Sequence, residues 1–124
     1  NDILKKINNK TKAIVVVHLY GFVFDVEKLK KKINKKIFII EDCAQAFGAE
    51  LNKKKAGTIG DFSCFSFHAQ KNLTTLGEGG AIYVKKNSLA KKIPGLRHNG
   101  HAPYGKRKFY WKPAMGNLDL DLKK

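Results

Sequence analysis

Short apolar runs alternate with polar segments along most of the chain. The β-branched run 13–18, with polar residues before it and Gly21 after it, predicts a buried strand. Residues 25–34 place apolar side chains on one helical face and lysines on the other, with Asp25 as candidate N-cap. A second buried run, 37–40, ends in an acidic pair. A strand, a helix and a strand in this order predict a βαβ unit with parallel strands.

The rest of the pattern predicts two more strands, their connections and helices near both ends. These elements are a turn or short helix at 43–50, a polar hairpin at 50–60, strands at 62–67 and 81–84, a Gly-rich bend at 77–80 and a short helix at 1–8. Another helix, with Asn87 or Ser88 as candidate N-cap, runs to about Arg97 and is interrupted at Pro94 and Gly95. Together these elements predict an α/β fold.

The composition is that of an ordinary folded domain. Of 124 residues, 43% are hydrophobic and 11 are Gly, which excludes a disordered, collagenous or coiled-coil chain and indicates one domain at most. No apolar run approaches the roughly 20 residues of a membrane span, and residues 1–12 lack the apolar core of a secretory signal. Cys43 and Cys64 do not make a disulfide framework, so we expect reduced thiols and a cytoplasmic protein.

The chain is strongly basic, with 25 Lys and Arg against 10 Asp and Glu and a formal net charge of +15. All but two of the basic residues, Arg97 and Arg107, are lysines, whereas nucleic-acid surfaces usually use arginine forks. The lysines gather at the ends of apolar segments and in expected turns. This distribution favours a solvated lysine-rich surface over a nucleic-acid-binding module, which is the alternative. We therefore expect neither a nucleic acid nor a membrane as partner.

The positions just after the strands are the informative ones, because an α/β sheet binds ligands beyond the carboxyl ends of its strands. They are His18, Asp42 and residues 66–71. A carboxylate such as Asp42 at the end of a buried strand costs several kcal/mol to desolvate unless a cation or donors meet it, and one candidate cation is a protonated heterocycle. Lys71 lies outside the lysine clusters, with an amide residue on each side. A lysine desolvated there can act as an amine nucleophile or form a Schiff base.

Four sequence blocks carry a resemblance to a known family. They are VVHLYG at 16–21, IEDCAQAFGA at 40–49, GTIGDFSCFSFHAQKN at 57–72 and GEGGA at 77–81. In order and spacing, across about residues 13–100, these blocks resemble the DegT/DnrJ/EryC1/StrS family of sugar aminotransferases. The resemblance implies a pyridoxal 5′-phosphate (PLP) enzyme of the aspartate aminotransferase-like, type I fold. The chain would be the central portion of its large domain, a mostly parallel sheet with flanking helices.

The resemblance also implies roles for individual residues. Lys71 would form the Schiff base with the cofactor aldehyde and, once displaced, move the proton at the amino-bearing carbon. Asp42 would pair with the pyridinium nitrogen and keep the ring an electron sink. Gln45 would lie against the ring face, and Ser66 would hydrogen-bond the phosphate. The reaction implied transfers an amino group, with glutamate as donor, to a nucleotide-linked keto sugar in amino-sugar and surface polysaccharide biosynthesis, and the full-length enzyme would be a homodimer.

Each of these residues also has a purely structural interpretation. Lys71 could be one more solvent-facing lysine, Asp42 a turn or cap residue, and Gln45 and Ser66 ordinary turn and strand residues. We expect His18 and His68 to be histidines satisfied at the sheet end, and the two cysteines to be small apolar fillers, with no metal site. The bend at 77–80 lacks the Lys-Ser/Thr ending of a phosphate loop, so we interpret it as a strand-connecting turn.

The resemblance covers only a middle section of the family's large domain. We expect the N-terminal part of that domain and the small C-terminal domain to be absent from these 124 residues, 101–124 to be an irregular tail, and the piece to be inactive alone. Asn117 has no following Arg and is assigned no role. A related sugar dehydratase would carry a His in place of Lys71, which argues against that variant. A non-catalytic truncated remnant is the other alternative.

Overall fold

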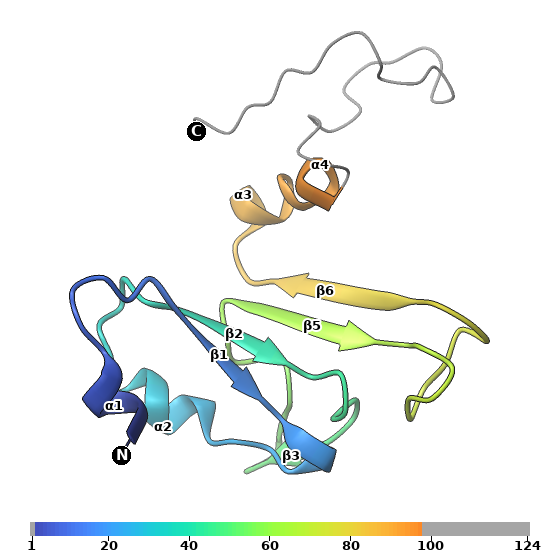
Figure 1. Ribbon diagram of the computed structural model, residues 1–124, viewed down its shortest axis with the longest axis horizontal. Coiled ribbons are helices and arrows are strands. Elements are labelled where there is room, and N and C mark those ends of the chain that lie inside the picture. The colour runs from blue at the N-terminus through green and yellow to red at the C-terminus, as the bar shows by residue number, and fades with distance from the viewer. Residues whose placement is uncertain (1, 98–124) are drawn as a thin grey trace, which may run out of the picture. The chain divides into compact units, whose positions relative to one another are not determined.

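The computed structural model describes residues 2–97 (Figure 1). These residues belong to two units, which divide between Lys85 and Lys86 and are described separately. Within the described range, no helix has the length and apolar character needed to cross a membrane. The expected irregular tail at 101–124, with Asn117, lies outside the described residues.

A four-stranded sheet organises the first unit (Figure 1). Its strands are β1 (Ala13–Val17), β2 (Phe38–Asp42), β5 (Phe62–Ser66) and β6 (Gly80–Val84), in the spatial order β1-β2-β5-β6. β1, β2 and β5 run parallel, and β6 pairs antiparallel with β5. The mostly parallel α/β sheet predicted from the sequence is therefore confirmed. β2 begins one residue later than the predicted run and continues through the acidic pair Glu41–Asp42.

The helices of this unit are shorter than the sequence pattern predicts. They are α1 (Asp2–Lys6), the 3₁₀ turn η1 (Leu19–Gly21) and α2 (Val26–Lys30). Asp25 caps α2 as predicted, its side chain accepting a hydrogen bond from the Lys28 backbone N–H at 2.8 Å. The prediction that this helix reaches 34 is wrong. Only the buried residues Val26 and Leu29 anchor it, and a helix this short depends on such tertiary burial.

The predicted polar hairpin is formed by β3 (Glu50–Leu51) and β4 (Lys54–Lys55), which pair antiparallel. Both residues between the strands, Asn52 and Lys53, have positive φ (52° and 62°). Two consecutive residues in this region suit the twist of a two-residue hairpin loop. The segment between β2 and β3 contains turns and no helix, so the turn alternative predicted for 43–50 is the correct one.

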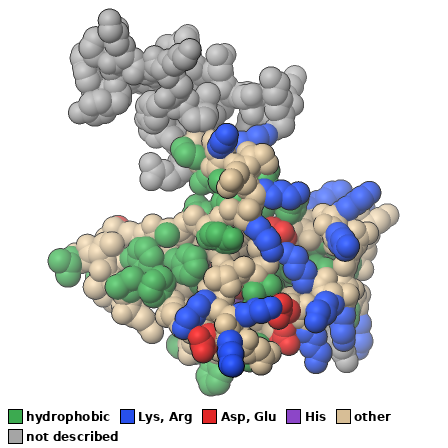
Figure 2. Space-filling view, turned by 180° about the vertical axis from the view of Figure 1, so that it is seen from behind, with side chains coloured by type: hydrophobic (Ala, Val, Ile, Leu, Met, Phe, Trp, Pro, Cys, Tyr) green, Lys and Arg blue, Asp and Glu red, His purple; other side chains and the backbone are tan. Residues whose placement is uncertain are grey.

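Within the described residues of the first unit, 2–85, one face of the sheet is covered and the other is bare. The covered face holds the core of Val16, Val26, Leu29 and Ile39, and a second buried group of Cys43, Ala46 and Ala56 lies near the strand ends. On the opposite face, side chains from three strands are 41–60% exposed: Val15, Val17, Phe38 and Ile82. Figure 2 shows hydrophobic side chains gathered on one part of the surface, with lysines and a few acidic residues on another. Parallel sheets are normally covered on both faces.

The second unit contributes α3 (Asn87–Ala90) and α4 (Ile93–Arg97). The sequence predicted one helix interrupted at Pro94 and Gly95, but both residues lie within α4 and the break falls before Ile93. Pro94 lies in the first turn of α4, where its missing N–H has no helical partner to lose. The predicted caps are wrong, because Lys86 occupies the N-cap of α3 without a side-chain cap.

Candidate active site

The carboxyl ends of β1, β2 and β5 meet at one edge of the sheet. The register pairs Val17 with Asp42 and Asp42 with Cys64, so His18, Asp42 and Ser66 all fall at this edge. Because side chains alternate along a strand, Asp42 and Ser66 face the bare side of the sheet, the same side as Val17 and Cys64. The sequence predicted the ligand site at this end of the sheet. Two of the four predicted site residues, Asp42 and Ser66, lie here on the same face of the sheet.

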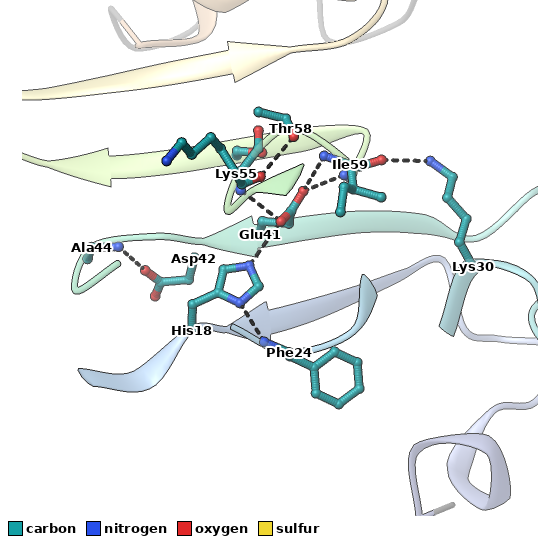
Figure 3. A network of polar contacts seen from close by, with 12 residues as sticks. His18, Phe24, Lys30, Glu41, Asp42, Ala44, Lys55, Thr58 and Ile59 are labelled. Atoms are coloured by element: carbon teal, nitrogen blue, oxygen red, sulfur yellow. Dashed lines mark hydrogen bonds and ion pairs between the residues drawn. The ribbon is translucent and has the colours of Figure 1, made fainter. Parts of the chain in front are cut away.

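Asp42 is the last residue of β2 and is half-buried. Its Oδ1 accepts a hydrogen bond from the Ala44 backbone N–H at 3.0 Å (Figure 3). Among residues 2–97, Oδ2 makes no hydrogen bond or ion pair. The carboxylate is thus oriented by its own turn and keeps one oxygen for a partner on the bare face.

Gln45 lies in the turn after β2 and connects this turn to the loop after β1. Its Oε1 accepts a hydrogen bond from the Tyr20 backbone N–H at 3.1 Å. Since a backbone N–H can only donate, this contact fixes which end of the amide is the oxygen. Tyr20 has a positive φ of 52°, unusual for a bulky residue. Gln45 therefore holds a strained loop in place and presents its NH₂ group as the remaining donor.

Lys71 lies in the connection between β5 and β6. Hydrogen bonds between the two ends of this connection hold it closed. Phe67 donates its N–H to Gly79 O at 2.7 Å and accepts at its carbonyl from Thr75 N–H at 3.0 Å, and His68 pairs with Gly77 as a β-bridge. The Lys71 N–H donates to His68 O at 2.9 Å. Lys71 is half-buried, and its Nζ has no hydrogen bond or ion pair with any described residue. The structure thus does not join Lys71 to Asp42 directly.

Ser66 ends β5 and is half-buried. Its Oγ accepts from the His68 N–H at 3.4 Å. The Gly-rich bend is the strand connection that the sequence predicts, since β6 begins at Gly80. A Cβ at Gly80 would lie 2.6 Å from Phe65 O, and one at Gly79 would lie 2.3 Å from Thr75 Oγ1. These glycines therefore allow a close approach of backbone to backbone and to Thr75.

The histidines are satisfied at the sheet end, as predicted. His18 is fully buried; its Nδ1 accepts from the Phe24 N–H at 3.1 Å and its Nε2 lies 2.9 Å from Glu41 Oε2. The Phe24 contact requires an unprotonated Nδ1, so Nε2 carries the proton and donates to Glu41. His68 accepts from the Gln70 N–H at 3.2 Å and lies 3.4 Å from Glu78 Oε1.

Glu41 is the residue that sequence reasoning missed. From the sequence, Asp42 was expected to be the carboxylate that is costly to desolvate, yet Glu41 is the fully buried one. Its Oε2 accepts from Gly57 N–H at 2.9 Å and its Oε1 from Ile59 N–H at 2.9 Å and from Gly60 N–H (Figure 3). The sequence did indicate this burial. Side chains alternate along a strand, so Glu41 lies on the same face as the apolar Ile39, two residues earlier.

The donors around Glu41 outweigh its burial. Burial alone would raise the pKa of the carboxyl, but the backbone N–H of Gly60, the His18 side chain and the N–H groups of Gly57 and Ile59 favour the charged form and hold the pKa below its ordinary value. Glu41 is therefore a carboxylate with every oxygen engaged, and it is unsuited to act as an acid or base.

The same region brings His18, Glu41 and Cys43 within 4.8 Å of one another, a grouping that could be taken for a metal site. Burial, followed by the charges of Glu41 and Asp42, raises the pKa of the Cys43 thiol to about 12. A metal-ligating cysteine must be a thiolate, and both ring nitrogens of His18 are already engaged. The chemistry of this donor set does not suit a metal ion. Cys43 is the buried filler that the sequence predicts, but the same prediction is wrong for Cys64, which is exposed.

Comparison with known proteins identifies the chain's relatives. The model of the DegT/DnrJ/EryC1/StrS aminotransferase family matches residues 1–119. GDP-perosamine synthase from Escherichia coli O157:H7 is 41% identical over 117 residues, which cover 94% of this chain and 31% of that protein. This chain thus spans about a third of the length of that relative.

Solved structures agree with the sequence match. The PLP form of Spr1654 from Streptococcus pneumoniae aligns with a TM-score of 0.69 and 32% identity, over 79% of this chain and 30% of that one. A mutant GDP-4-keto-6-deoxymannose-3-dehydratase, ColD, with bound GDP-perosamine aligns with a TM-score of 0.71 and 29% identity, over 79% of this chain and 25% of that one. From the family match and these alignments together, the chain belongs to the DegT/DnrJ/EryC1/StrS aminotransferase family.

Proposed function

We propose that these residues form the cofactor-binding part of a PLP-dependent aminotransferase that transfers an amino group from glutamate to a nucleotide-linked keto sugar. The observation that carries the proposal is the placement of Asp42 and Ser66 on one bare face at the carboxyl edge of the sheet, directly before the loop that holds Lys71. The names of the relatives supply the substrate class, because GDP-perosamine synthase is among them.

The residues present fit PLP. The Asp42 carboxylate keeps one oxygen without a partner among residues 2–97, which suits the N–H of a protonated pyridine. The Ser66 hydroxyl can donate to a phosphate oxygen, since its hydrogen bond with His68 uses it only as an acceptor. The Lys71 amine is likewise without a partner in the described part of the chain, as a residue that bonds an aldehyde carbon must be.

Each side chain then has a defined task. Asp42 would hold the ring nitrogen protonated, Gln45 would contact the ring, and Ser66 would bind the phosphate. Lys71 would hold the cofactor through its aldehyde carbon and, when the substrate amine displaces it, carry a proton to and from the amino-bearing carbon. When bound, PLP supplies the electron sink that stabilises negative charge at that carbon.

Of the alternatives that the sequence raised, the dehydratase and the nucleic-acid-binding module have less support, and the non-catalytic remnant is tested by the cofactor labelling described next. A dehydratase of this family would lack the lysine at position 71, and the chain has it. A nucleic-acid-binding module explains the charge of +15 but assigns no role to Asp42 or Lys71. We further propose that the complete enzyme is a homodimer in the cytoplasm, in keeping with its nucleotide-sugar substrate and with two free thiols at Cys43 and Cys64.

The complete gene product, incubated with PLP and reduced with borohydride, tests the cofactor assignment. Peptide mapping should find the pyridoxyl group on Lys71, and Lys71→Arg should abolish this adduct while the matched surface variant Lys85→Arg retains it. Labelling spread over many lysines with no preference for Lys71 contradicts the proposal. Incubation with glutamate and nucleotide-linked keto sugars should give an amino sugar by mass; loss of water without gain of nitrogen would identify a dehydratase instead.

A further inference from the structure

We propose that His18 and Glu41 are positioning residues that set the geometry of Asp42 and Gln45 from the opposite side of the sheet. This inference rests on the proposed function, because Asp42 and Gln45 are the side chains assigned there to the cofactor ring. Neither His18 nor Glu41 faces the bare side, so they would act only through other residues.

His18 holds two consecutive residues of β2. Its backbone N–H donates to Asp42 O at 3.0 Å, and its Nε2 donates to Glu41 Oε2 at 2.9 Å. The residue directly after β1 thus fixes the peptide group of Asp42 and the side chain of the residue before it. Because side chains alternate along the strand, fixing Glu41 on the covered face directs Asp42 to the bare face.

His18 also closes the loop that orients Gln45. Its Nδ1 accepts from the N–H of Phe24, at the far end of the loop that follows β1, and the N–H of Tyr20 inside this loop donates to Gln45 Oε1. The strained φ of Tyr20 needs such support from its surroundings. A contact path therefore runs from His18 through the loop to the amide of Gln45.

Glu41 extends the same arrangement toward β5. Its carboxylate accepts from the N–H groups of Gly57, Ile59 and Gly60, in the loop that leads into β5 and so to Ser66. Lys30 holds the same loop from α2, its Nζ donating to Ile59 O at 3.2 Å (Figure 3). The strand carrying Asp42 and the loop leading to the strand carrying Ser66 thus share one buried carboxylate.

The energetics of burial support a role beyond stability for the His18–Glu41 pair. A well-packed apolar pair can be as stabilising as a buried hydrogen-bonded pair that includes a charged group, because the desolvation of the polar groups offsets much of their attraction. The described core has apolar residues at the same face, such as Val16 and Ile39. What the hydrogen-bonded His18–Glu41 pair adds at the strand ends is directional bonding, which defines one position for each side chain where apolar contact would allow several.

Two substitutions at His18 separate its two side-chain contacts. His18→Asn places an amide oxygen near the position of Nδ1 and so keeps the acceptor for Phe24, whereas His18→Gln places an amide N–H near Nε2 and so keeps the donor to Glu41. Leu29→Ala, on the same face and outside the site, is the control for lost stability. All three are made in the complete gene product and compared by thermal unfolding, by amide hydrogen exchange of the apo protein and by PLP dissociation constant.

We expect His18→Gln to increase hydrogen exchange over 19–24 and to weaken PLP binding at least tenfold. His18→Asn should protect 19–24 better and bind PLP more tightly than His18→Gln, while Leu29→Ala should be destabilised with a nearly unchanged PLP dissociation constant.

Equal PLP affinity in wild type and both His18 variants, or an affinity that follows melting temperature through all three variants, overturns the proposal. If one His18 variant does not fold, the other is compared with Leu29→Ala on the same terms. Wild-type protein without the Lys71 adduct would refute the proposed function instead, and the exchange of 19–24 would still show whether His18 holds the loop.

Discussion

Glu41 and Asp42 are consecutive on β2 and have opposite surroundings. The Glu41 carboxylate is fully buried and accepts four hydrogen bonds on the covered face. Within residues 2–97 the Asp42 carboxylate accepts one hydrogen bond, from the Ala44 N–H, and it faces the bare side. The acidic pair at the end of this parallel strand thus divides into one carboxylate that holds neighbouring backbone in place and one that, under the proposed function, would bind the cofactor.

Gly60 should tolerate no side chain. A Cβ there would lie 3.0 Å from Glu41 Cγ, from Glu41 Oε1 and from Ile39 O. We expect Gly60→Ala to lower the free energy of unfolding by about 1–3 kcal/mol, because neither the engaged carboxylate nor the strand backbone is able to move away. Chemical denaturation measures this loss. Gly77→Ala is the matched control, since nothing lies within 4 Å of its Cβ, and a loss of equal size in both variants would contradict the explanation.

Acid should destabilise the fold through Glu41. Its pKa in the folded protein lies below the ordinary value of 4.5, so unfolding takes up a proton there. The stabilisation is complete above that ordinary value and is lost as the pH falls through the lower, folded-state pKa. Urea unfolding from about pH 6 down to about pH 3 should show this decline, and Glu41→Gln, itself less stable, should show a smaller one. An unchanged pH profile in the variant would assign the acid sensitivity to other groups.

The Cys43 thiol should be unreactive in the native protein. Burial raises its pKa to about 12, so almost no thiolate is present near neutral pH. Iodoacetamide at about pH 8 should leave Cys43 unmodified in the folded protein and modify it after denaturation, as read by peptide mass. Because the folded-state pKa is raised, the thiol also favours unfolding as the pH rises from about 9 toward 12. Rapid native labelling of Cys43 would show that the second buried group opens readily.

The cap of α2 should be measurable despite the shortness of the helix. Asp25→Ala removes the acceptor for the Lys28 N–H, and we expect a loss of about 1 kcal/mol in the free energy of unfolding. Asp25→Asn keeps a side-chain oxygen at the cap and should lose much less. If the two variants are equally stable, the helix end is satisfied by solvent and the capping bond contributes little.

The sequence predicted the order and type of the main elements, because strand periodicity and turn residues are local properties. The strands at β1, β5 and β6, the hairpin and the Asp25 cap all followed from such patterns. Helix ends were less predictable, since Leu29 is the last buried anchor of α2 and burial depends on what packs against the helix. The interruption predicted at Pro94 and Gly95 is wrong, because both residues lie within α4 and a proline in the first turn of a helix removes no helical hydrogen bond.

The candidate site was predictable in residue type and only partly in arrangement. Asp42 and Ser66 fall at one sheet edge because parallel neighbouring strands end together, which the order of elements already implied. The buried role of Glu41 depends on three backbone N–H groups from residues 57–60, a long-range contact that no local pattern contains. The orientation of Gln45 likewise depends on Tyr20, 25 residues earlier in the chain.

The one-sided sheet has a consequence for handling residues 1–124 alone. The apolar face that is bare within the first unit, with Val15, Val17, Phe38 and Ile82, favours association between molecules. A net charge of +15 makes the same molecules repel one another. Salt screens the repulsion and leaves the apolar attraction in place. The isolated polypeptide should therefore stay dispersed in dilute buffer and scatter light increasingly as sodium chloride is added, the reverse of a protein whose aggregation is electrostatic.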